Sequence, residues 1–189
     1  MNLPNKLTLL RIILIPIFAV IYFLPIIPYN YVISAVIFLV AALTDFLDGY
    51  IARKYNLVTD LGKFLDPIAD KVLVSTALII MLCAPIGGVV ILPYYATIAV
   101  AVILARELMV SGFRMVAASK GLVIAADKTG KIKTFTQDVA ILVLLVGANV
   151  DPGLYSIVNI IGLAILGVSA LLTIVSGAEY IVKNRKVLK

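Results

Sequence analysis

Three long blocks without charged side chains most constrain what this chain can fold into. Residues 12–44 and 72–105 contain no Asp, Glu, Lys or Arg, and residues 139–178 contain only Asp151. A membrane-spanning helix needs about 20 mostly apolar residues, so each block is long enough for two helices joined by a tight turn. Turn-forming prolines, glycines and asparagine lie within each block, at 25–30, 85–93 and 151–153.

The sequence therefore predicts an all-α, polytopic membrane protein with one domain over residues 1–189. Its six transmembrane helices are expected near residues 6–24, 30–53, 62–84, 92–118, 132–149 and 154–182. With 63% hydrophobic and only 14% charged residues, the chain is too apolar to form a water-facing surface. All sixteen Lys and Arg lie outside the three turns, in the termini and in residues 53–71 and 106–133. Because positive charge favours the cytoplasmic side, we expect both termini to be cytoplasmic.

The acidic residues are concentrated in one short region. The chain has no histidine and a single cysteine, so acid–base chemistry and metal binding must rest largely on carboxylates. Five of the ten acidic residues fall between positions 45 and 70: Asp45, Asp48, Asp60, Asp66 and Asp70. Helical geometry places Asp45 and Asp48 on one face, and Asp66 and Asp70 on one face of the next helix if it continues past Pro67. Such an all-oxygen site suits hard cations such as Mg²⁺, Mn²⁺ or Ca²⁺.

Other interpretations of this region stay open. Pro67 can instead begin a helix with Asp66 as its N-cap. The small residues Gly49, Ala52 and Gly62 suit close helix packing as well as ligand binding. The aspartates can also form ion pairs with basic neighbours, namely Arg53, Lys54, Lys63 and Lys71. A divalent-cation transporter would use the same aspartates, but it should carry acidic groups on both sides of the membrane.

The spacing of residues 45–70 carries a family resemblance. The segment reads Asp-x2-Asp-Gly-x2-Ala-Arg-x8-Gly-x3-Asp-x3-Asp, and this resembles the signature of the CDP-alcohol phosphotransferase family. The resemblance implies a six-helix membrane enzyme that transfers a phosphatidyl or similar group from a CDP-linked lipid to an alcohol and releases CMP. It also implies a homodimer and phospholipids, rather than nucleic acid, as partners.

The resemblance also assigns roles to individual residues. It implies two ions, Mg²⁺ or Mn²⁺, bound by Asp45, Asp48, Asp66 and Asp70, with Asp70 as the general base. The pocket for the CDP-linked lipid is expected to include Gly49, Ala52, Arg53 and Gly62. Asn5 and Thr8 are further candidates for contact with the nucleotide, and an N-cap role at the first helix is the alternative for both.

The acceptor alcohol is predicted from segments outside the signature. Residues 5–11, 62–71, 105–114 and 130–134 resemble the branch of the family that uses glycerol 3-phosphate. This acceptor is a small dianion, so its pocket needs fixed cations. The candidates are Arg106, Arg114, Lys131 and Lys133. The alternatives are an ion pair of Arg106 with Glu107 or with another helix, and simple positive-inside anchoring by the two lysines.

We therefore expect transfer of the phosphatidyl group from CDP-diacylglycerol to glycerol 3-phosphate, in phospholipid biosynthesis. The protein is expected in the cell membrane with its active site facing the cytoplasm. The nearest alternative is a cardiolipin synthase of the same family, whose acceptor is phosphatidylglycerol and which needs no pocket for a terminal phosphate.

Overall fold

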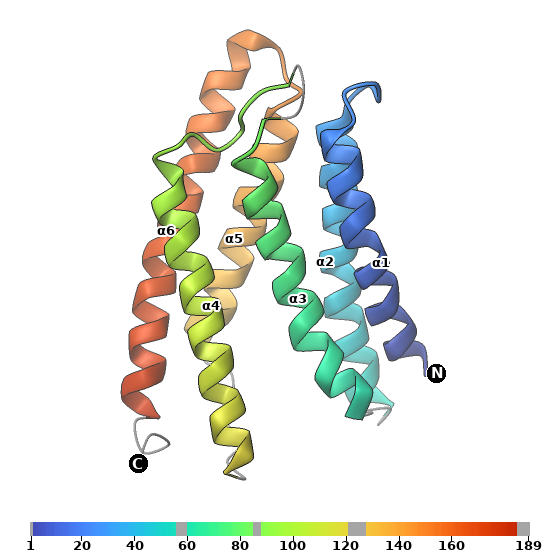
Figure 1. The fold of residues 1–189 in the computed structure, drawn as a ribbon, viewed down its shortest axis with the longest axis vertical. Coiled ribbons are helices and arrows are strands. Elements are labelled where there is room, and N and C mark those ends of the chain that lie inside the picture. The colour runs from blue at the N-terminus through green and yellow to red at the C-terminus, as the bar shows by residue number, and fades with distance from the viewer. Residues whose placement is uncertain (1, 56–59, 85–87, 121–127, 185–189) are drawn as a thin grey trace.

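The computed structural model describes residues 2–55, 60–84, 88–120 and 128–184, and its regular elements there are all α-helices (Figure 1). In chain order they are α1 (Leu3–Phe23), α2 (Asn30–Lys54), α3 (Asp60–Met81), α4 (Ala96–Ser119), α5 (Lys128–Gly147) and α6 (Pro152–Lys183). The predicted all-α class and the order of six helices are confirmed. The helix ends differ from the predicted ends by a few residues, because caps and short polar flanks extend or shorten each helix.

One alternative from the sequence is wrong. Helix α3 begins at Asp60 and continues without interruption to Met81, so it does not start at Pro67 with Asp66 as its N-cap. Pro67 is the eighth residue of this helix, where a proline has no N–H to donate to the carbonyl four residues earlier, and the helix nevertheless continues past it. Asp66 and Asp70 consequently lie one turn apart on a continuous helix.

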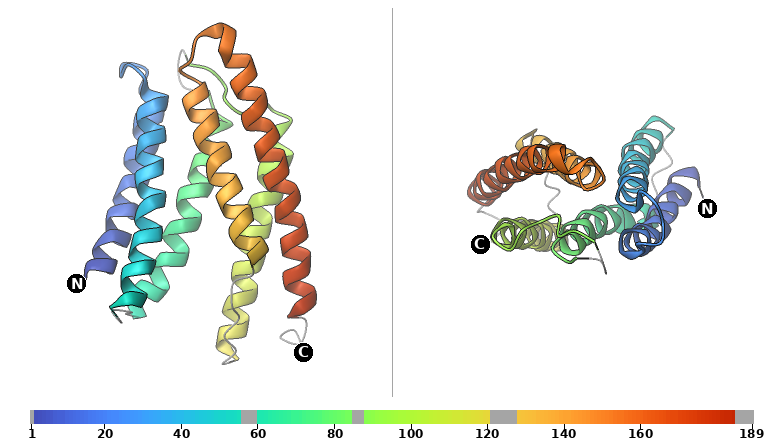
Figure 2. Two further views of the ribbon diagram at one scale, coloured as in Figure 1. Left: turned by 180° about the vertical axis from the view of Figure 1, so that it is seen from behind. Right: turned by 90° about the horizontal axis from the view of Figure 1, so that it is seen from above.

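The helices alternate in direction along the bundle. The start of α1, the end of α6, the ends of α2 and α4, and the starts of α3 and α5 all point to one end of the molecule (Figure 1). Viewed from above, α1 and α2 form a pair on one side and α5 and α6 form a pair on the other (Figure 2). These two pairs also make the most extensive helix contacts, and α2 additionally contacts α5.

The apolar core lies mainly in the half of the bundle away from the termini. Phe18 and Phe38 are fully buried, with ring centroids 6.0 Å apart. Hydrogen bonds hold the connections between helices at this end. Asn30 Nδ2 donates to Tyr22 O at 2.9 Å, and Leu92 N donates to Met81 O at 2.9 Å. The polar residues of the bundle lie mainly in the other half, nearer the termini.

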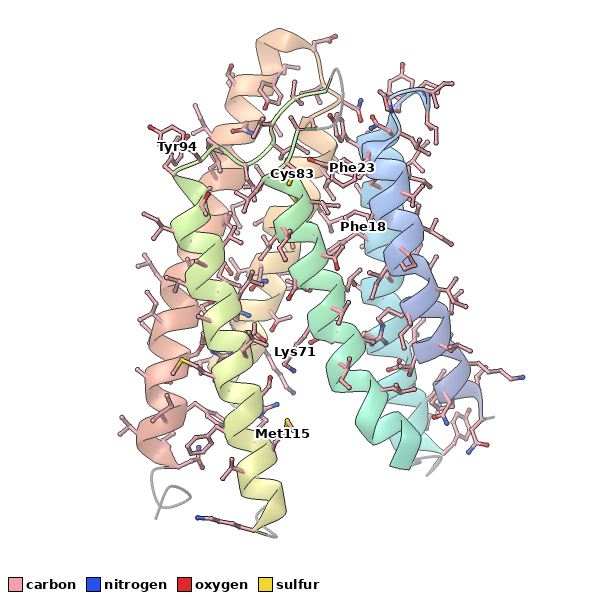
Figure 3. All side chains as sticks on the ribbon, in the orientation of Figure 1. Phe18, Phe23, Lys71, Cys83, Tyr94 and Met115 are labelled. Carbon is pink, nitrogen blue, oxygen red and sulfur yellow. The ribbon has the colours of Figure 1, made fainter. Side chains whose placement is uncertain are left out.

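The outer surface is apolar, as expected for lipid contact. Among the described residues, four helical segments are long and apolar enough to cross a membrane: Leu3–Phe23, Asn30–Ile51, Ala96–Ala117 and Gly153–Lys183. Outward-facing side chains such as Ile98, Leu171 and Val182 are highly exposed. Helices α3 and α5 are outside that set because they carry more of the polar side chains that form the site. Figure 3 shows one of these, Lys71, in the same half of the bundle as Met115.

Candidate active site

Carboxylates from two neighbouring helices form an acidic wall. Asp45 and Asp48 lie one turn apart near the end of α2, and Asp70 lies on α3. All three line one cavity of about 940 Å³, together with the backbone of Gly49. Gly49 has no side chain to fill the cavity beside the carboxylates, so a ligand can approach them there.

A buried arginine on α1 contacts two of these carboxylates. The side chain of Arg11 is fully buried, and its Nη1 donates to Asp45 Oδ1 at 2.6 Å while its Nη2 donates to Asp48 Oδ2 at 2.5 Å. Thr8 Oγ1, one turn earlier, lies 3.3 Å from the same Asp48 oxygen. An unpaired carboxylate is costly within a membrane protein, and the guanidinium compensates two of them.

A second charged cluster joins three other helices. Glu107 on α4 accepts hydrogen bonds from Arg106 Nη1 at 3.0 Å and from Lys133 Nζ, on α5, at 2.5 Å. Arg106 Nη2 also donates to Ser176 Oγ on α6 at 3.1 Å. The ion pair between Arg106 and Glu107, which the sequence left as an alternative, is therefore present. Glu107 also pairs with Lys133, so one glutamate orients two cations.

Two further cations lie on the cavity wall without such a carboxylate contact in the described part of the chain. Arg114 Nε donates to Tyr180 Oη at 3.2 Å, and its guanidinium lies 5.4 Å from the centre of that ring. Lys131 is exposed, and both Lys131 and Arg114 line the cavity. Their charges are accessible to an anion that enters it.

The cavity brings together half of the residues predicted for the site from the sequence. Its lining includes Asp45, Asp48, Gly49, Asp70, Arg106, Arg114 and Lys131. Lys133 lines a small adjoining gap with Asp70 and Glu107. A volume of this order is typical of ligand pockets. One space thus holds both the acidic wall and the cations.

Of the other predicted residues, three are described but are not among the lining residues of this cavity, and the side chains of three more are not described. Asn5 and Thr8 are buried within α1, and Gly62 is buried in α3. Because α1 begins at Leu3 after Asn2, the N-cap interpretation of Asn5 and Thr8 is wrong. The side chains of Ala52, Arg53 and Asp66 lie outside the described residues.

The described carboxylates do not by themselves enclose an ion. Among the side chains that the structure describes, no three acidic groups converge closely enough to hold a metal. Asp45 and Asp48 face Arg11, while Asp70 stands on the neighbouring helix. Their chemistry nevertheless fits a hard cation, because all are carboxylates that already attract positive charge.

The sequence analysis missed two polar residues of α5. Asp138 lines the cavity, and Gln137 is only 1% exposed and lines the adjoining gap. The signal was present, because Lys131, Thr134 and Asp138 repeat at the three- and four-residue spacing of one helical face. The sequence predicts Lys131 for the phosphate site, and the same polar face continues along α5 to Asp138.

Comparison with known proteins assigns the class. The family model described as CDP-alcohol phosphatidyltransferase matches residues 1–175 of the 189. Its match covers every described helix except the end of α6. The chain belongs to this family, and it is a membrane protein related to phosphatidyltransferases.

The similar proteins carry a more specific name. A protein of Bacillus subtilis (strain 168) is 45% identical over 100% of this chain and 97% of its own length, and is named CDP-diacylglycerol--glycerol-3-phosphate 3-phosphatidyltransferase. Proteins with the same name from Rickettsia bellii (strain RML369-C) and Salmonella paratyphi A (strain ATCC 9150 / SARB42) are 40% and 38% identical. Each of those two alignments covers 95% of this chain and 93% of the relative.

Proposed function

We propose that this chain transfers the phosphatidyl group of CDP-diacylglycerol to glycerol 3-phosphate and releases CMP. The observation that carries the proposal is a single cavity lined by three signature aspartates and by the cations Arg106, Arg114 and Lys131. The relatives that match over nearly their whole length bear the name of this activity. The family membership also favours a transferase over a divalent-cation transporter.

The acidic wall is proposed to hold two divalent ions, Mg²⁺ or Mn²⁺. Asp45, Asp48 and Asp70 would bind them together with Asp66, and the presence of the Arg11 guanidinium on two of these carboxylates supports a site built for positive charge. When bound, such ions would neutralise the pyrophosphate of CDP-diacylglycerol and stabilise CMP as the leaving group.

The reaction itself is a substitution at the lipid-linked phosphorus. We propose that Asp70 accepts the proton of the C1 hydroxyl of glycerol 3-phosphate as its oxygen attacks this phosphorus. A new P–O bond forms to glycerol, and the P–O bond to CMP breaks with both electrons leaving on CMP. Asp70 faces the cavity from α3, so its carboxylate is accessible to a hydroxyl bound there.

The two substrates are proposed to occupy opposite walls. The nucleotide lies near α1, α2 and α3, where Asn5, Thr8, Gly49, Ala52, Arg53 and Gly62 are located. The glycerol phosphate lies near α4 and α5, with its phosphate on Arg106, Arg114, Lys131 and Lys133. Glu107 holds Arg106 and Lys133 in place, which reduces the ordering that phosphate binding requires.

We further propose that all six helices cross the membrane and that both termini lie in the cytoplasm. Helices α3 and α5 then cross inside the bundle, where their polar residues face the cavity rather than lipid. The acyl chains remain in the bilayer while the headgroup reacts at the cytoplasmic side. A homodimer, as the family resemblance implies, is part of this proposal.

A direct assay tests the proposed acceptor. Purified protein in mixed micelles with CDP-diacylglycerol is given radiolabelled glycerol 3-phosphate or phosphatidylglycerol. We expect label from glycerol 3-phosphate to enter a lipid product in equal amount to the CMP released. Consumption of phosphatidylglycerol with no incorporation of glycerol 3-phosphate would instead indicate a cardiolipin synthase.

A further inference from the structure

Asp138 is a carboxylate that the proposed mechanism does not use. It lies on α5 and lines the same cavity as Asp45 and Asp70. Its Oδ1 atom is buried and has no hydrogen-bond partner among the described residues. No ion pair joins it to another side chain in that part of the structure, whereas Arg11 pairs with the carboxylates on the opposite wall.

A purely structural role does not account for this carboxylate. Lys133 lies five residues earlier on the same helix, but its Nζ is already 2.5 Å from Glu107 Oε1. A buried carboxylate without donors is unfavourable, and a side chain of this kind in a membrane helix is by default functional. Asp138 is therefore placed to accept a hydrogen bond from a ligand in the cavity.

The position of Asp138 on α5 indicates which part of a ligand it meets. Lys131 and Asp138 are seven residues apart, so they share one helical face and are separated by about 10 Å along the axis. Lys131 is exposed, whereas Asp138 is partly buried. Helix α5 thus presents a cation for a phosphate and, further along the same face, an acceptor for hydroxyl groups.

Glycerol 3-phosphate carries one hydroxyl that has no assigned contact. Its phosphate is assigned to the cations and its attacking C1 hydroxyl to Asp70, which leaves the hydroxyl on C2. The carboxylate of Asp138 can present either oxygen to the cavity, because rotation about its terminal torsion is broad. Asp70 and Asp138 line the same cavity, so one acceptor bound there can face both carboxylates.

We propose that Asp138 is a specificity residue that accepts a hydrogen bond from the C2 hydroxyl of the glycerol phosphate acceptor. This inference rests on the proposed function. The contact holds the acceptor with its C1 hydroxyl toward Asp70 and favours a polyol phosphate over an alkanol phosphate. A site that hydrogen-bonds a substrate hydroxyl discriminates strongly against an analogue that lacks it.

The test measures the activity of several enzyme variants with each of two acceptors. Wild type, Asp138→Ala and Asp138→Asn are assayed with glycerol 3-phosphate and with 3-hydroxypropyl phosphate, which lacks only the C2 hydroxyl. We expect wild type to prefer glycerol 3-phosphate by ten- to a hundredfold in kcat/KM, the value of one hydrogen bond to a charged group. Asp138→Ala should lose that preference. Its kcat/KM for glycerol 3-phosphate should fall, whereas its kcat/KM for the analogue should stay within about threefold of the wild-type value.

Asp138→Asn keeps an oxygen acceptor and nearly the same shape, so it tests the role of the carboxylate even if the alanine variant folds poorly. It should retain a reduced preference, because a neutral acceptor makes a weaker bond than a carboxylate. Asp151→Asn, at an exposed position before α6, is the matched control and should behave as wild type.

The other outcomes overturn the proposal in distinguishable ways. Equal losses for both acceptors in the alanine and asparagine variants would show that Asp138 does not contact the C2 hydroxyl. A changed requirement for added metal with unchanged acceptor preference would assign Asp138 to the metal instead. A wild type that uses neither acceptor would overturn the proposed function itself, whereas a wild type that uses both equally would overturn only the role of Asp138.

Discussion

Arg11 Nη2 lies 2.5 Å from Asp48 Oδ2, and both side chains are almost completely removed from solvent. The contact joins the first helix to the end of the second, across 37 positions of sequence. The same guanidinium reaches Asp45, so α1 fixes two carboxylates of the signature. The first helix is therefore part of the site as well as part of the membrane anchor.

Replacing Arg11 should destabilise the protein strongly. Arg11→Gln removes the guanidinium that contacts Asp45 and Asp48, and removing one partner of a buried ion pair such as Arg11–Asp48 costs about 3–5 kcal/mol. Thermal unfolding in detergent should occur at a clearly lower temperature than in wild type. Arg11→Lys should recover part of the loss, because lysine restores the charge but not the two-armed geometry.

The control for this prediction is on the same helix. Lys6 is exposed, so Lys6→Gln should unfold close to the wild-type temperature. If Arg11→Gln unfolded at that temperature too, the ion pairs would not contribute to the stability of the bundle.

The α5–α6 contact should be sensitive to a single added methyl group. A Cβ at Gly162 would lie 2.6 Å from Leu144 Cγ, which is far closer than real contacts allow, whereas a Cβ at Gly167 on the same helix meets nothing within 4 Å. Gly162→Ala should destabilise the protein by about 1–3 kcal/mol through overpacking. Gly167→Ala is the matched variant and should be neutral, as judged by thermal unfolding; equal effects of both would contradict the observed packing.

The exposed cations of the cavity should govern affinity for the acceptor. Arg114→Gln and Lys131→Gln each remove a charged contact proposed for the phosphate, worth about 1.5–3 kcal/mol or roughly ten- to a hundredfold. Steady-state kinetics should show a raised KM for glycerol 3-phosphate and little change in KM for CDP-diacylglycerol. Lys120→Gln, an exposed substitution away from the cavity lining, should leave both values unchanged. Wild-type values in the first two variants would remove these residues from the acceptor site.

The proposed orientation in the membrane predicts opposite labelling at the two ends of α4. Tyr94 is 88% exposed before the start of α4, and Lys120 is exposed just after its end. In a Cys83→Ser background, Tyr94→Cys should react with an impermeant maleimide on intact cells. Lys120→Cys should react only after the membrane is opened. The reverse pattern would place the active site on the outer side.

The helices were predictable because the physics behind them is local. Long uncharged runs require membrane helices, and the helix-breaking residues near Asp151 predict approximately where the chain turns between the last two helices. The acidic wall was also predictable, since Asp45 and Asp48 share a helical face by spacing alone and Asp70 belongs to the same signature.

The partners of those carboxylates could not be predicted in the same way. Basic neighbours in sequence were the obvious candidates for Asp45 and Asp48, and Arg11 from another helix, which also contacts both, was not among them. The convergence of Lys133 and Arg106 on Glu107 also depends on how α4 packs against α5 and α6. Such contacts arise from tertiary packing, and helical periodicity within one segment carries no information about it.

We propose that the signature aspartates form the site of a metal-dependent phosphatidyltransferase. The measurement that tests this is the incorporation of radiolabelled glycerol 3-phosphate into lipid from CDP-diacylglycerol by wild type and Asp70→Asn, each with and without chelator. We predict that chelator abolishes transfer by wild type, that Mg²⁺ or Mn²⁺ restores it, and that Asp70→Asn is slower by about 10²–10⁴-fold at any metal concentration. Transfer that persists in chelator, or a folded Asp70→Asn variant with the wild-type rate, would contradict the account.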